Sequence, residues 1–131
     1  MTRVKPVLVA GALVVAGAVV FVVGRGAAAD PINLTTTGDR YAATVLIEDP
    51  APGRVAVEVK VSKGDADSVA VSAVMADMGH STPELAATER EPGRFLAEGE
   101  LFSMSGVWEL SIRLDGPAGE EQLAVKALIT G

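Results

Sequence analysis

Three side chains that could bind a soft metal ion lie close together in the middle of this chain. Met75, Met78 and His80 fall within six residues, His80 is the only histidine, and Met104 is the one further methionine beyond the N-terminus. Thioether sulfur and imidazole nitrogen suit Cu(I), and less well Cu(II), whereas Ca²⁺ and Mg²⁺ require oxygen ligands. The residue types therefore indicate a copper site if these two parts of the chain meet.

Each candidate ligand also has a structural explanation. Met75 continues the parity of the apolar residues before it, so core packing would account for it. Met78 and Met104 could equally be apolar plugs at the end of a folded domain. A lone histidine in a loop is more often solvated than bound to a metal. The residues alone leave the choice between metal ligands and ordinary packing open.

The sequence offers little support for catalysis. It contains no cysteine, so a disulfide, a thiolate zinc site and a cysteine nucleophile are excluded. No serine lies in a recognisable nucleophile elbow or beside a base. Asp65 and Asp67 resemble a fragment of a calcium loop, but the later ligands are missing and a turn explains them better. We expect the protein not to be an enzyme.

The charge of the chain restricts its partners. From Asp30 to the C-terminus, eight basic residues stand against all 17 acidic ones, a net charge of −9. Nucleic acid is therefore a poor partner, and the domain surface is not expected to dock onto anionic lipid. The same charge would favour a cation or a basic protein, or would serve solubility alone.

An apolar run at residues 7–23 predicts a membrane segment. With residues 6 and 24 it comprises 19 residues without a charge, and a helix of that length spans about 28 Å, close to the hydrocarbon core of roughly 30 Å. Arg3 and Lys5 precede it, so the domain is expected on the extracytoplasmic side of the cell membrane. Alanines at 27–29 also fit a signal-peptidase site, so segment 1–29 is a single-pass anchor or a cleaved signal, and the domain is secreted if it is cleaved.

The remaining chain indicates strands. Residues 30–40 contain Pro31, a run of threonines and Gly38 without an apolar period, which predicts a tether. From residue 41 onward, apolar and polar residues alternate at period two between breaks rich in Gly, Pro and Asp. The predicted strands are 41–47, 55–61, 68–76, 85–89, 94–101, 107–114 and 121–130.

About seven short strands with no helical period predict an all-β fold, an immunoglobulin-like antiparallel β-sandwich over residues 41–131. Loops at one end of a sandwich meet, which would bring Met78 and His80 near Met104. The predicted core is Trp108, Leu110, Ile112 and Leu114 packed against Val55, Val57, Val59, Val69 and Val71.

Three sequence pieces suggest a family. In order, the chain contains MADMGH at 75–80, EPGRF at 91–95 and MSGVWEL at 104–110. Together they resemble the YtkA-like domain, which is related in pattern to the FixH proteins, across residues from about 41 to 130. The resemblance implies a membrane-tethered immunoglobulin-like domain associated with copper handling or respiratory oxidase assembly, with Met78, His80 and Met104 as the residues to examine. Met75 matches less closely.

Two functions follow as expectations. The first is a membrane-anchored extracytoplasmic β-sandwich that binds Cu(I) weakly through Met78, His80 and Met104, with Met75 as a further ligand, and passes it to a partner. The second is a structural or interaction module of the cell envelope that needs no metal and meets another protein through its acidic surface or an exposed edge strand.

Overall fold

The computed structural model describes residues 30–130, which fold almost entirely into β-strands. The alternation of buried and exposed side chains along the strands follows the period-two pattern of the sequence. The elements are β1 (Ile32–Thr37), β2 (Ala42–Ile47), β3 (Gly53–Lys63), β4 (Ser68–Met75), the 3₁₀ helix η1 (Ala76–Met78), β5 (His80–Ser81), β6 (Leu85–Ala86), β7 (Thr88–Glu91), β8 (Arg94–Phe102), β9 (Gly106–Gly116) and β10 (Gly119–Ile129).

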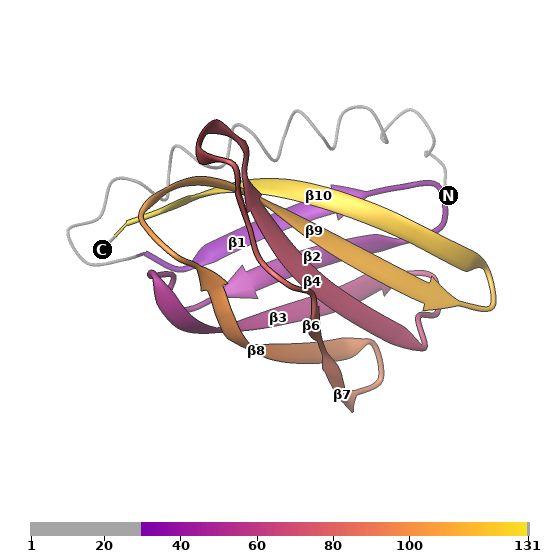
Figure 1. Cartoon of the computed structure of the whole chain (residues 1–131). Helices are drawn as coiled ribbons and strands as arrows, with labels where there is room; N and C mark the ends of the chain where they lie inside the picture. The colour runs from indigo at the N-terminus through magenta and orange to yellow at the C-terminus, as the bar shows by residue number, and fades with distance from the viewer. Residues whose placement is uncertain (1–29, 131) are drawn as a thin grey trace.

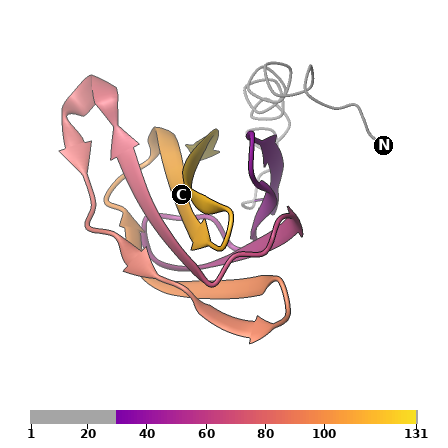
Figure 2. The ribbon, with the colours of Figure 1, turned by 90° about the vertical axis from the view of Figure 1, so that its right-hand side faces the viewer.

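The strands form two antiparallel sheets that face each other (Figures 1 and 2). One sheet has the order β1-β2-β3-β8-β7, and the other has the order β10-β9-β4-β5 with β6 also paired to β4. The turn after β4, which contains η1, projects beyond the neighbouring strands at the top of Figure 1. The architecture confirms the predicted all-β antiparallel sandwich.

The predicted core is also confirmed. All nine residues named from the sequence are buried in one hydrophobic cluster. The valines of β3 come from one sheet, whereas β4 and β9 contribute from the other. Trp108 is fully buried, its ring lies edge-on to Phe102 with centroids 5.7 Å apart, and its indole N–H donates to the backbone oxygen of Met104 at 3.0 Å.

Three details of the predicted fold were wrong. The described residues contain ten strands, not about seven, because β1 and β5 are additional and the strand expected at 85–89 is divided into β6 and β7. Segment 30–40, predicted as a tether, contains β1. Ile32, Leu34 and Thr36 alternate inward and are fully buried, so the threonines of this segment belong to a strand and not to a linker.

The predicted membrane or signal segment, residues 1–29, lies outside the described residues. Within residues 30–130, no helix is long and apolar enough to cross a membrane.

One carboxylate ties the turn between β1 and β2 to the start of β10. Glu121 accepts hydrogen bonds from the backbone N–H groups of Asp39, Arg40 and Tyr41, at 2.8 to 2.9 Å. The Tyr41 hydroxyl donates to the backbone oxygen of Gly119 at 2.7 Å. This hydrogen bond and those to Glu121 therefore connect the β1–β2 turn of one sheet to β10 of the other. Burial, followed by the negative charge of Asp115, raises the pKa of Tyr41 and keeps its hydroxyl a donor.

We expect Glu121→Ala to lower the free energy of unfolding by about 2 kcal/mol, because three backbone donors lose a charged acceptor. Glu121→Gln, which keeps one carbonyl oxygen, is expected to lose less. Urea unfolding of the three proteins measures the difference. A loss below about 0.5 kcal/mol for Glu121→Ala, the range of ordinary surface changes, would contradict this role.

Candidate metal centre

Met75 is the last residue of β4 and lies at one end of the sandwich. Its side chain is only 4% exposed, which confirms the inward parity predicted for it. It pairs directly with His80 of β5, so the two residues are cross-strand neighbours on the same face. Met75 can therefore be a core residue and also lie beside His80.

Gly106 allows Met75 to lie next to the chain segment that carries Met104, the second segment of the candidate site. A Cβ atom on Gly106 would lie 2.5 Å from the terminal methyl carbon of Met75 and 3.8 Å from its sulfur, so the thioether occupies the space that a side chain would need. Gly106 also has φ of 141°, a conformation that L side chains rarely adopt. The thioether of Met75 thus packs over the chain two residues beyond Met104.

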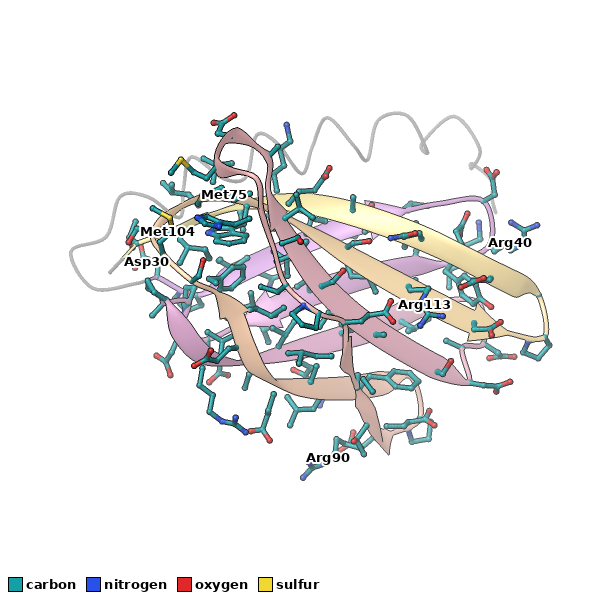
Figure 3. The ribbon with its side chains drawn as sticks, in the orientation of Figure 1. Asp30, Arg40, Met75, Arg90, Met104 and Arg113 are labelled. Carbon is teal, nitrogen blue, oxygen red and sulfur yellow. The ribbon has the colours of Figure 1, made fainter. Side chains whose placement is uncertain are left out.

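Met104 lies in the loop between β8 and β9. Its backbone oxygen accepts the Trp108 hydrogen bond, which fixes this loop to the core, while its side chain is 37% exposed. Figure 3 shows the labelled side chains of Met75 and Met104 at the same end of the sandwich. The structure thus brings Met75 to the segment that carries Met104. The predicted convergence of Met78 and His80 on Met104 stays a prediction.

Met78 ends η1 and is the most exposed large apolar side chain in the described residues, at 57%. Gly79 follows with φ of 69° and its N–H donates to the backbone oxygen of Ala76 at 3.2 Å, so the chain reverses within a few residues. This left-handed glycine returns the chain so that His80 can pair with Met75. Met78 therefore does not plug the core, and His80 is likewise exposed.

The segment after His80 is held on β4 and β9 by contacts that the sequence did not suggest. Thr82 accepts at its hydroxyl from the N–H of Ala73 at 3.1 Å, and its own N–H donates to the Ala73 oxygen at 3.0 Å. Further along, Arg113 donates two hydrogen bonds to the carboxylate of Glu84, at 2.7 and 2.6 Å. Nothing in the spacing of these residues marked them as partners, since the contacts depend on how the strands pair.

We expect the Glu84–Arg113 pair to stabilise the domain only above acidic pH. The hydrogen bonds from Arg113 hold the pKa of Glu84 below its ordinary value of 4.5. Because the folded pKa is the lower one, the stabilisation is complete above about pH 4.5 and is lost as the pH falls through the folded pKa. Thermal unfolding of wild type and Glu84→Gln should therefore differ at neutral pH and converge in acid. A difference that stays constant with pH would contradict this.

The four candidate residues have the donor chemistry of a soft metal site. They offer three thioether sulfurs and one imidazole, a set that fits Cu(I) and does not fit a hard cation. Within residues 30–130, no group of three or more His, Cys, Asp or Glu side chains is arranged to hold a metal ion. A hollow of about 490 Å³ on the outer face of β2, β3 and β8, lined by Leu46, Arg54 and Leu96 among others, includes none of the four.

Known structures share this fold at low sequence identity. The copper-bound form of a FetP variant from uropathogenic Escherichia coli strain F11 matches with a TM-score of 0.56 and 9% identity, over 78% of this chain and 92% of that chain. An engineered protein matches with a TM-score of 0.51 and 19% identity, over 80% of this chain but 21% of its own. These identities establish a similar fold alone. No family model matches the sequence, and no curated protein matches it significantly.

Proposed function

We propose that this protein is a non-enzymatic, membrane-anchored extracytoplasmic domain of YtkA-like, immunoglobulin-like type that binds Cu(I) weakly. Met78, His80 and Met104 are the proposed ligands and Met75 is a further one. The copper is cargo, taken up at this end of the sandwich and passed to a partner in the cell envelope.

The observation that carries the proposal is the position of Met75. It pairs with His80 on one side and packs over Gly106 on the other, so it bridges the two chain segments that hold the remaining ligands. Thioether sulfur and imidazole nitrogen are donors that suit Cu(I), and the two segments that Met75 joins carry both kinds.

The exposure of Met78 and Met104 fits a protein that transfers copper to a partner better than one that stores it permanently. Met78 and Met104 are both accessible to solvent, whereas Met75 is shielded. A site with exposed donors lets a partner's ligands approach the metal before the first protein releases it. The similarity of the fold to copper-bound FetP supports a role in copper binding, but this similarity concerns the fold alone.

The test is thermal unfolding with Cu(I) under reducing conditions. A ligand at 100 times its dissociation constant should stabilise wild type by about 2.7 kcal/mol. His80→Ala should lose most of this increase, while Gln122→Ala, an exposed change on β10, should keep it. An equal increase in His80→Ala and wild type would exclude His80 as a ligand.

A second candidate function, an interaction module without metal, is favoured by one observation. The exposed large apolar residues of the described chain gather at this same end: Val74, Met78, Met104 and Val107. Val107 pairs with Leu128 across β9 and β10, which extends the apolar surface. Metal analysis of the protein purified from its native compartment discriminates the two functions, since the module would carry no copper.

A further inference from the structure

The three methionines of the described chain differ sharply in their exposure to solvent. Met78 is 57% exposed and Met104 is 37% exposed, but Met75 is 4% exposed and its methyl group packs over the backbone of Gly106. Oxidation of a thioether requires that the oxidant reach the sulfur, so susceptibility follows exposure. The three methionines therefore comprise two accessible sulfurs and one protected sulfur.

We propose that Met78 and Met104 are peroxide-sensitive modification sites whose oxidation to methionine sulfoxide switches off copper binding. This inference rests on the proposed function, because it assigns a means of regulation to the same site. Its substrate class is a hydroperoxide, with hydrogen peroxide as the simplest member.

The reaction balances with peroxide as the only oxidant. The sulfur lone pair attacks one peroxide oxygen, the O–O bond breaks, an S–O bond forms, and the remaining oxygen leaves as water after a proton shift. Sulfur loses two electrons and the peroxide gains them. The product is a polar sulfoxide that a methionine sulfoxide reductase can return to the thioether.

The modification changes the donor set at the site. A sulfoxide offers mainly oxygen, a hard donor, where Cu(I) prefers soft sulfur. After both outer methionines are oxidised, Met75 and His80 are the two soft or borderline donors left among the four candidates. Cu(I) would then be bound by two groups instead of four, and its affinity should fall.

The burial of Met75 restricts oxidation to the two exposed methionines. Because the Met75 thioether fills the space over Gly106, its oxidation would place a polar oxygen in the core and disturb the packing there. Slow reaction at Met75 lets the outer sulfurs be modified and repaired while the fold remains intact.

The first experiment maps the oxidation. The full chain in peroxide-free detergent is treated with limiting hydrogen peroxide, and peptide mass spectrometry follows each methionine over time. We expect Met78 and Met104 to react at least tenfold faster than Met75, and all three to react at similar rates in urea. Equal rates for Met75 and Met78 in the folded protein would overturn the proposal.

The second experiment measures metal binding with Ag(I), which substitutes for Cu(I) without reducing peroxide. The oxidised protein should bind Ag(I) at least tenfold more weakly than the untreated protein, and reductase treatment should restore binding. In Met78→Leu/Met104→Leu, peroxide should leave the already weakened affinity unchanged. Equal affinity before and after oxidation of wild type would refute the switch but leave the copper proposal standing.

The failures of the two proposals are distinguishable. If the untreated protein binds neither Ag(I) nor Cu(I), the copper function is wrong and the switch falls with it, while the oxidation map still reports which sulfurs are accessible. If untreated protein binds and oxidised protein does not, both proposals are supported.

Discussion

Val57→Asp is expected to abolish cooperative folding of the domain. Val57 is fully buried in the middle of β3, and its neighbours on the same face, Val55 and Val59, are buried with it. A carboxylate there would be unpaired in an apolar core, or protonated at a large free-energy cost. Because the net stability of a small domain is only about 5 to 15 kcal/mol, a loss of several kcal/mol removes most of it.

The matched control is Ala56→Asp, at the preceding residue of the same strand. Ala56 is exposed on the outer face and pairs with Glu98, so the change adds a like charge in solvent and should cost at most about 1 kcal/mol. Circular dichroism and urea unfolding compare the variants. A soluble Val57→Asp protein with a cooperative transition near that of wild type would show that this face of β3 is not in the core.

Met78→Leu combined with Met104→Leu is expected to weaken Cu(I) binding about 100-fold, or about 2.7 kcal/mol. Leucine preserves the apolar volume but removes the sulfur, and both side chains are exposed, so the fold should not change. Competition with a Cu(I) chelator under reducing conditions gives the affinity.

Val107→Ala is the control for this pair, because it shortens an exposed apolar side chain at the same end without removing a donor. It should leave the Cu(I) affinity unchanged. If Val107→Ala weakens Cu(I) binding as strongly as the double variant, the affinity depends on apolar packing at this end of the sandwich and not on coordination by the two methionines.

The sequence predicted those parts of the fold that depend on local alternation. The pattern of Val55, Val57 and Val59 in β3, and of Trp108 and Leu110 in β9, follows directly from the period of a strand with one buried face. Strand positions and the core were therefore predictable, although β3 and β9 each extend further than expected.

The apolar pattern of the sequence did not reveal strands that carry few apolar residues or are very short. In β1 only Ile32 and Leu34 mark the inward face, and threonines continue it, so the segment resembled a linker. The two residues of β5 have no period of their own and become a strand only because Met75 offers a partner to His80. Pairing of this kind is a tertiary property.

The sequence supplied the candidate residues of the site, which stay a prediction, but it did not indicate how the fold positions them. Gly106 enters the sequence analysis only within the MSGVWEL piece, and nothing there indicates that the space over it admits the Met75 thioether. The place of Met75 both in the core and beside His80 combines the two explanations that the sequence had kept apart.

The most direct test of the copper site is nuclear magnetic resonance of the protein with ¹³C-labelled methionine methyl groups during titration with Cu(I) under reducing conditions. Single Met→Leu variants assign the methyl signals, and the ring signals of His80 are followed in parallel. We predict that the signals of Met75, Met78, Met104 and His80 change together and saturate at one equivalent of Cu(I). A response confined to Met78, or an unchanged Met104 signal at saturation, would contradict a site shared by the two segments.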